Sequence, residues 1–261
     1  MRRAFIVSSS ILILIAAQTA HAQKSSGVLR LDMGAKEVDG RVYKPHAAKV
    51  KIYIGDRPTG AEWTNVLHVG DSAGRPVHYW TTTGTSIGQD GQPVKWELQQ
   101  TYDAITLQPY SIVRTASNGM ESRLKIEGTR VTGTRKLNAN APVENIDYTV
   151  DRMGYVASAS DLVPAAVGFK EGLVISVPIW GPPMTKAEQR TFTVVGKGDV
   201  DVEGTKVNAW KVEEHRESDS KLLATWYLLD KSPYMVYGEV ILPNGNVQRM
   251  TEVEVPLPAR R

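Results

Sequence analysis

Alternation of apolar and polar residues with a period of two is the feature that most restricts how this chain can fold. The segment "KVKIYI" at residues 49–54 is typical, and residues 94–102, 120–126 and 247–255 alternate similarly, the last less cleanly. A period of two places successive side chains on opposite faces of a β-strand. Strands with one apolar and one polar face are typical of antiparallel sheets that are wet on one side.

Turn signals separate these segments, and helical signals are few. Asn-Gly or Glu-Gly pairs follow the strand-like segments near residues 117, 127, 203 and 244, and such pairs tolerate the positive φ of tight hairpin turns. Only residues 160–169, with Ser160 or Asp161 as N-cap, and residues 182–190 favour short helices. We therefore predict an all-β or β-dominated fold of about a dozen strands, built as a large curved antiparallel sheet or half-barrel.

The domain organisation follows from the distribution of strands. No internal repeat or low-complexity linker interrupts residues 23–261, although the composition shifts over residues 138–161. Each flank of that segment carries too few strands to close separately. We predict one β-rich domain over residues 23–261, with two halves of the sheet meeting near residues 138–161.

Two later segments are apolar on both faces. These segments are residues 173–180, "LVISVPIW", and residues 222–229, "LLATWYLL". In each of them, both sets of alternating positions are mainly apolar. Both faces of such a strand must be covered. A short helix covers the second face, or that face lines an apolar cavity.

The N-terminal residues 1–22 have the pattern of a secretory signal peptide. Arg2 and Arg3 precede an apolar stretch over residues 5–17, and "AHA" at residues 20–22 fits a cleavage site. We expect export, a mature chain that begins at Gln23, and a periplasmic or extracellular location. No other stretch has the length of a membrane-spanning helix.

Charge and cysteine content exclude several classes of function. Residues 1–22 hold two arginines and no acid, so the 31 Lys and Arg fall to 29 against 28 Asp and Glu, a formal charge of +1. That balance, without a basic block, does not favour nucleic acid. The chain has no cysteine, which excludes disulfides, thiol catalysis, cysteine-ligated metals and a lipoprotein anchor.

Three segments of the chain have a recognisable pattern: "YDAITLQPYSIVRTAS", "TFTVVGKGDVDVEGTKVNAWKVEEH" and "LLATWYLLDKSPYMVYGEV". Through them, residues 96–254 resemble a family of exported bacterial proteins with a domain of unknown function. The resemblance implies a curved antiparallel sheet like that of the periplasmic lipoprotein carriers LolA and LolB, a half-barrel whose concave side holds acyl chains. No catalytic residues are implied.

Ser86 lies at the centre of a G-x-S-x-G match, "GTSIG". A hydrolase nucleophile elbow needs a strand before the serine and a helix directly after it. The strand is present, but "QDGQPVKWELQQ" follows, with Gly91, Pro93 and strand-like alternation. We expect Ser86 in a polar loop, and a serine hydrolase stays the less favoured alternative.

No cofactor or metal is predicted. His68, Asp71 and His78 lie close in sequence but match no zinc-ligand spacing, and we expect the two histidines to be cross-strand polar neighbours. Acidic pairs such as Glu213 and Glu214 look like solvated strand edges. No glycine-rich phosphate loop precedes a helix, so a nucleotide cofactor is not expected.

The aromatic residues are the remaining indication of a binding function. Amphipathic rings suit ligand platforms, and they equally suit cross-strand pairs in a sheet core. We predict a non-catalytic envelope protein that binds an apolar or lipid-like ligand in a curved-sheet cavity. The expected ligand-binding residues are Trp180, Trp210, Trp226 and Tyr237. The alternative is a scaffold or assembly factor that binds another envelope protein.

Overall fold

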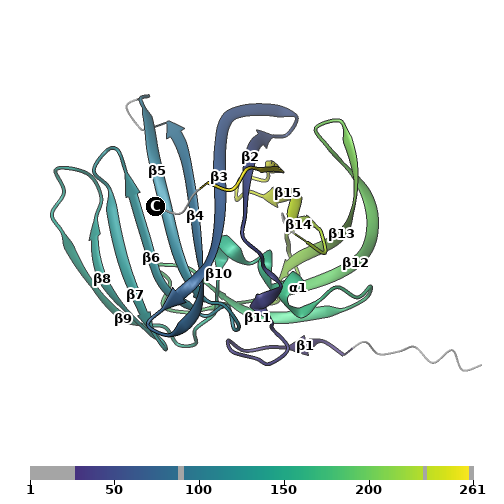
Figure 1. The fold of residues 1–261 in the computed structure, drawn as a ribbon, viewed down its shortest axis with the longest axis horizontal. Helices are drawn as coiled ribbons and strands as arrows, with labels where there is room; N and C mark the ends of the chain where they lie inside the picture. Colours follow the sequence, from purple (N-terminus) through teal and green to yellow (C-terminus); the bar gives the residue numbers. More distant parts are fainter. Residues whose placement is uncertain (1–26, 88–90, 232–233, 259–261) are drawn as a thin grey trace, which may run out of the picture.

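Every strand that the structure describes belongs to one large, curved sheet. The structure is a computed structural model, and it describes residues 27–87, 91–231 and 234–258. Within these ranges the sheet has sixteen strands and the chain has one short α-helix. Figure 1 shows the sheet wrapping around an interior in which the helix lies. The prediction of a β-dominated, curved antiparallel sheet is therefore confirmed.

The elements follow one another along the chain as two runs of strands separated by short helices. The first run is β1 (Leu29–Arg30), β2 (His46–Ile54), β3 (Arg57–Ser72), β4 (Arg75–Ile87), β5 (Pro93–Asp103), β6 (Pro109–Ala116), β7 (Glu121–Glu127), β8 (Arg130–Lys136) and β9 (Glu144–Thr149), with the 3-10 helix η1 (Gly40–Val42) after β1. Next come β10 (Tyr155–Val156), the 3-10 helix η2 (Ala157–Ala159) and α1 (Leu162–Val167). The second run is β11 (Val174–Trp180), β12 (Glu188–Val202), β13 (Thr205–Arg216), β14 (Leu222–Leu228), β15 (Met235–Ile241) and β16 (Val247–Val255).

Two antiparallel meanders make up the sheet. Strands β2 to β9 pair consecutively, and so do β11 to β16. The meanders join where β16 pairs with β2, with Met250 opposite Ile52 and Glu252 opposite Val50. Residues 150–173, which overlap the predicted junction near residues 138–161, carry the chain from the β9 end of the sheet to the β11 end. The two meanders thus share one continuous sheet.

The sheet stays open, because β9 lies at one end of the strand order and β1 and β10 flank β11 at the other. Helix α1 covers the inner face, and Leu162, Val163 and Ala166 on it are buried. It is fixed to η1, since the Asp39 amide donates to the Ala166 carbonyl at 2.9 Å. The buried interior thus contains a helix in addition to the side chains of the sheet.

Of the two short helices predicted from the sequence, the first forms and the second does not. Helix α1 lies within residues 160–169, with Asp161 at the N-cap position. The helix expected over residues 182–190 does not form. A turn closes there instead, with the Met184 amide donating to the Gly181 carbonyl, and Gln189 and Arg190 already pair with β11. Pairing on both sides of β12 overrides the helical propensity of this segment.

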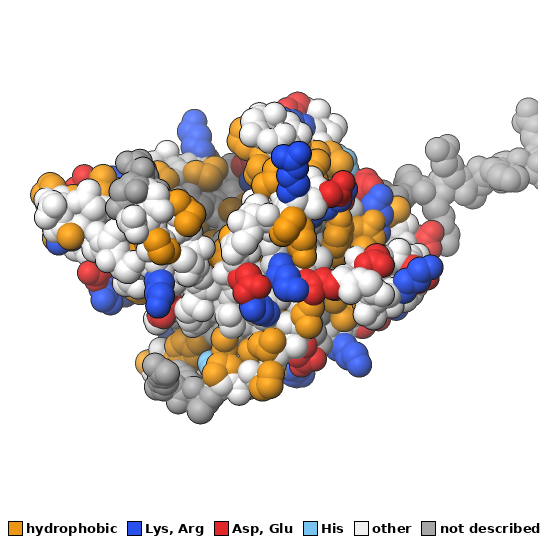
Figure 2. All heavy atoms as spheres, turned by 90° about the horizontal axis from the view of Figure 1, so that it is seen from above, with side chains coloured by type: hydrophobic (Ala, Val, Ile, Leu, Met, Phe, Trp, Pro, Cys, Tyr) orange, Lys and Arg blue, Asp and Glu red, His pale blue; other side chains and the backbone are white. Residues whose placement is uncertain are grey.

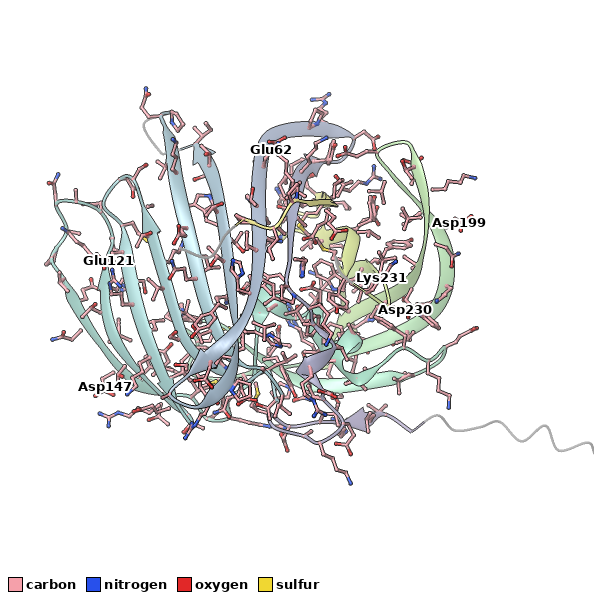
Figure 3. The ribbon with its side chains drawn as sticks, in the orientation of Figure 1. Glu62, Glu121, Asp147, Asp199, Asp230 and Lys231 are labelled. Atoms are coloured by element: carbon pink, nitrogen blue, oxygen red, sulfur yellow. The ribbon has the colours of Figure 1, made fainter. Side chains whose placement is uncertain are left out.

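Charged side chains lie mainly on the outside. Figure 3 labels Glu121, Asp147 and Asp199 at the periphery of the molecule. Among the described residues, no helix has both the length and the apolar character needed to cross a membrane. The predicted signal peptide, residues 1–22, lies outside the described residues.

Candidate functional site: a groove and a chamber on the concave face

A groove of about 660 Å³ runs along the concave side of the β3–β9 wall. Its apolar side chains come from alternate positions of neighbouring strands and include Trp63, Trp96, Leu98, Ile112, Leu124 and Ile146. Residues 181–183 and the start of η2 border it from the other side. Figure 2 shows a recess in the surface with hydrophobic side chains at its margins. The period-two pattern of the strands therefore gives the groove its apolar wall.

Two tryptophans divide this groove from a smaller space deeper inside. Trp63 of β3 and Trp96 of β5 meet edge to face, with ring centroids 5.9 Å apart, across Gly84 of β4. A Cβ atom at Gly84 would lie 2.7 Å from Trp63 Cδ1 and 2.6 Å from Trp96 Cζ2. Glycine at this position lets the two indoles approach each other over the middle strand.

The smaller space, the chamber, has a volume of about 230 Å³. Four tryptophans lie in its wall, and polar side chains lie between them. The tryptophans are Trp63, Trp80, Trp96 and Trp226. Five residues, Trp63, Trp96, Leu98, Gln100 and Ser158, line the groove and the chamber alike, so the two spaces are neighbours. Gln100 Nε2 donates to Ser158 Oγ at 2.9 Å, and this pair forms a polar partition between them.

Two carboxyl groups line the chamber, from opposite parts of the fold. Glu252 projects from β16 and is 5% exposed. Its Oε1 accepts a long hydrogen bond from Asn65 Nδ2 at 3.4 Å, and its Oε2 has no hydrogen-bond partner among the described residues. Asp161 is at the N-cap position of α1, but its side chain makes no capping hydrogen bond. Both side chains border the chamber.

Burial weakens both acids. It raises the pKa of Glu252 to about 8, with the negative charge of Asp161 as a further cause. Burial likewise raises the pKa of Asp161 to about 7, and the charge of Glu214 adds to the shift. Desolvation disfavours the charged form of a carboxyl group. Each group therefore holds its proton at a pH where exposed carboxyls have lost theirs.

Glu214 provides a contrast, since its charge is compensated. This side chain is 1% exposed. Its Oε1 accepts from Arg190 Nη1 at 2.6 Å, and its Oε2 accepts from Trp226 Nε1 at 2.8 Å. Neither a lysine nor an arginine is among the described residues that line the chamber. As far as the described residues show, the chamber is an aromatic space lined by two acids and by no lysine or arginine.

The outer groove has its own polar groups. Arg135 of β8 pairs with Glu144 of β9 at 2.6 Å. Arg114 of β6 also lines the groove, and the described part of the chain offers it no hydrogen-bond or ion-pair partner. The hydroxyl of Tyr148 is buried without a partner in the same described ranges. These groups place polar contacts at the margin of an otherwise apolar surface.

The four aromatic residues predicted to bind a ligand do not form one wall. Trp226 lines the chamber. Trp180 is fully buried in the core, where its Nε1 donates to the Met184 carbonyl at 2.7 Å. Trp210 stacks on Phe169 at 5.5 Å.

Tyr237 pairs edge to face with Tyr227, which is the cross-strand partner of Tyr237. Tyr237 packs against a separate small cluster of Val202, Ala209 and Val236.

The predicted site residues do not include four that line the chamber, namely Trp63, Trp80, Asp161 and Glu252. The available signals were the alternation of Trp63 and Trp80 with polar residues, and an acid at position 252 on the same face as Met250.

Ser86 is not at a nucleophile elbow. It lies within β4, opposite Val94 of β5, so the expectation of a loop is wrong. The strand pairing continues past it to Ile87 and Pro93, which leaves no strand-to-helix turn at the serine. The glycine at position 84 of the same motif has a packing role, because it leaves room for the contact between Trp63 and Trp96.

His68 and His78 face opposite sides of the sheet. His68 pairs with Tyr79, while His78 pairs with Val69. This offset of one residue reverses the face, so the expectation that the two histidines are cross-strand neighbours is wrong. His78 Nε2 instead lies 2.8 Å from the Gly40 carbonyl in the interior. The described residues contain no group of three His, Asp or Glu side chains able to hold a metal ion.

Comparison with known proteins gives two similar solved structures. One is a β-barrel-like protein of the domain of unknown function DUF1849 from Brucella abortus, at 12% identity and a TM-score of 0.48, covering 81% of this chain and 96% of that one. The other is a DUF1329 family protein from Desulfovibrio piger, at 12% identity and a TM-score of 0.22, covering 80% and 82%. No family model matches the chain, and no curated protein does. The similarity to LolA and LolB stays a prediction.

Proposed function

We propose that this protein binds an apolar or lipid-like ligand in the concavity of its curved sheet, without catalysis. The observation that carries the proposal is the groove of about 660 Å³ whose walls are mainly apolar. Burial of apolar ligand surface is favourable by about 25 cal/mol per Å². A groove of this volume falls in the range typical of small-molecule sites, roughly 300–1,000 Å³.

The groove also has the form expected of a carrier for a chain-like molecule. It is bordered by one sheet face and by the segment 181–183, so a ligand is covered from two sides. The cell envelope is the proposed location, on the strength of the signal-peptide pattern in residues 1–22. Fractionation of the source cells, with N-terminal sequencing of the mature chain, tests the location separately.

A variant that fills the groove tests the binding proposal. Ser122 lines the groove on the inner face of β7, so Ser122→Phe places a ring where the ligand would lie. Thr132→Phe on β8 is the matched control, because Thr132 pairs with Lys125 on the other face. We expect native mass spectrometry of the purified protein to find a co-purified lipid in the parent chain and in Thr132→Phe. Ser122→Phe should lose it.

A parent protein that carries no lipid and shows no thermal shift with fatty acids or phospholipid would contradict the proposal. Binding to another envelope protein is the alternative. A partner protein could pair with the free edge of β9. However, β9 carries two charged side chains, Glu144 and Asp147, which form ion pairs with Arg135 and Arg130 of β8. Charged side chains on an edge strand oppose pairing with another chain. The groove is therefore the better-supported site.

A further inference from the structure

We propose that the chamber binds a cationic ammonium group, and that the ligand of the groove is an amphiphile whose positively charged head enters the chamber. This inference rests on the proposed function and names the chemistry of the ligand's head. Four tryptophans and two carboxyl groups line the chamber. That combination matches the recognition of ammonium ions by aromatic faces.

The size and position of the chamber indicate a head group. Its volume of about 230 Å³ is below the roughly 300–1,000 Å³ of sites that hold a whole drug-sized ligand. It also borders the groove through Trp63 and Trp96. A chain lying in the groove can therefore extend its end past this pair of indoles.

Glu252 is the strongest single indication of a ligand. The side chain is 5% exposed, it faces the chamber, and among the described residues its Oε2 has no hydrogen-bond donor. A desolvated carboxylate without a compensating charge is destabilising. Asp161 adds a second carboxyl that the helix N-terminus does not use. A cation between them supplies the missing charge.

Other charged groups near the chamber do not replace the cation. Arg190 is already paired with Glu214 and Glu188. His46 lines the chamber from β2, and burial lowers its pKa, which keeps the imidazole neutral near pH 7. Tyr234 donates to the Val42 carbonyl. Burial raises the pKa values of Tyr43 and Tyr102, and the nearby negative charge of Asp161 raises them further. Both tyrosines therefore stay neutral.

Cation binding is expected to depend on pH in a defined direction. In the empty chamber Asp161 and Glu252 hold protons up to about pH 7 and 8 respectively. An ammonium ion favours the ionised carboxylates, so binding releases protons and strengthens as the pH rises from 6 toward 8. Calorimetry in buffers of different ionisation enthalpy measures this release directly.

Three probes with the same alkyl chain separate the head from the tail. Dodecyltrimethylammonium, dodecanoate and dodecanol are titrated below their aggregation concentrations at pH 8. We expect the ammonium probe to bind about tenfold tighter or more than the other two, as an aromatic and charged cage predicts. The double variant Asp161→Asn with Glu252→Gln should remove this preference and leave the binding of dodecanol unchanged.

A second variant tests the aromatic wall of the chamber separately from its two acids. Trp80 lines the chamber but not the groove, so Trp80→Leu should weaken the ammonium probe and spare dodecanol. Ser122→Phe, in the groove, should weaken all three probes. Circular dichroism and thermal melting confirm that each variant is folded.

The outcomes are distinguishable. If all three probes bind the parent equally and the double variant changes nothing, the head-group inference is overturned while the proposed function stands. If no probe binds, both are overturned. A preference for dodecanoate that Arg114→Gln abolishes would also overturn the inference, and it would identify an anionic head at the outer groove.

Discussion

The indole Nε1 of Trp226 donates a hydrogen bond to Oε2 of Glu214 at 2.8 Å. This buried contact joins β13 to β14 behind the chamber wall, and Arg190 completes it by pairing with the other carboxylate oxygen. Both oxygens of this buried carboxyl group therefore have a hydrogen-bond donor, and hydrogen bonds to charged groups are among the strong ones. Glu214, paired with Arg190, therefore holds the chamber wall in place. The two acids that line the chamber, Asp161 and Glu252, have no such basic partner among the described residues.

Removal of Arg190 should strongly destabilise the protein. Arg190→Leu leaves the charge of Glu214 buried without its cation, and breaking such a pair costs about 3–5 kcal/mol. Arg130→Leu is the control, because Arg130 pairs with Asp147 on the exposed face and solvent-exposed ion pairs contribute little to stability. Urea unfolding of both variants measures the difference. Equal losses would show that Glu214 is not held as described.

The tryptophan contact over β4 should be sensitive to a single methyl group. Gly84→Ala brings a Cβ into Trp63 and Trp96, and overpacking of this kind costs about 1–3 kcal/mol. We also expect a change in tryptophan fluorescence as the two rings separate. Gly198→Ala on β12 is the matched control, since a Cβ there has open space. Unchanged fluorescence and stability in Gly84→Ala would contradict the ring packing.

Stability should fall as the pH rises from 6.5 to 8.5. The folded pKa values of Asp161 and Glu252, about 7 and about 8, lie above their usual values. The folded state therefore binds more protons than the unfolded state, and the stabilisation present at low pH is lost as the pH passes these values. His46 and His78, whose pKa values are lowered by burial, oppose this trend only below about pH 6.5.

Thermal melting across that range measures the effect, with a loss on the order of a few kcal/mol. The double variant Asp161→Asn with Glu252→Gln provides the comparison. Its melting temperature should vary less between pH 6.5 and 8.5 than that of the parent. A parent whose stability rises over the same range would show that these carboxyl groups are not buried.

Two buried tyrosines should respond in opposite ways to loss of their hydroxyls. Tyr102 is 3% exposed, and its hydroxyl has no partner in the described ranges. Tyr102→Phe is therefore expected to be neutral or to stabilise by about 1 kcal/mol. Tyr43 donates to the Leu162 carbonyl at the start of α1, so Tyr43→Phe should destabilise by about 1 kcal/mol or more. Denaturant unfolding under one set of conditions gives both values.

The sequence predicts strands better than it predicts which face they bury. Strand β16 matches the alternating segment 247–255 at both ends, because period two is a local property of the chain. The chamber depends on the curvature of the whole sheet. Nothing in the alternation of Trp63 or Trp80 distinguishes a concave face from a convex one.

The errors have similar causes. Residues 182–190 have a helical composition, but Arg190 lies between β11 and β13 and follows their pairing. The one-residue offset between His68 and His78 depends on the hairpin turn between Ser72 and Arg75. Asp161 was identified only as a helix cap, since its position beside Glu252 comes from strands distant in sequence.

The pairing of β16 with β2 has a consequence for how the chain acquires its structure. These strands lie at opposite ends of the described sequence, yet their hydrogen bonds join the two meanders. Such a connection has high contact order, and proteins rich in distant contacts fold slowly. Each meander can form locally as it emerges, but the sheet is completed only after β16 is available. A chain that lacks its last strand would gain two further unpaired sheet edges, on β15 and β2, and would expose the chamber to solvent.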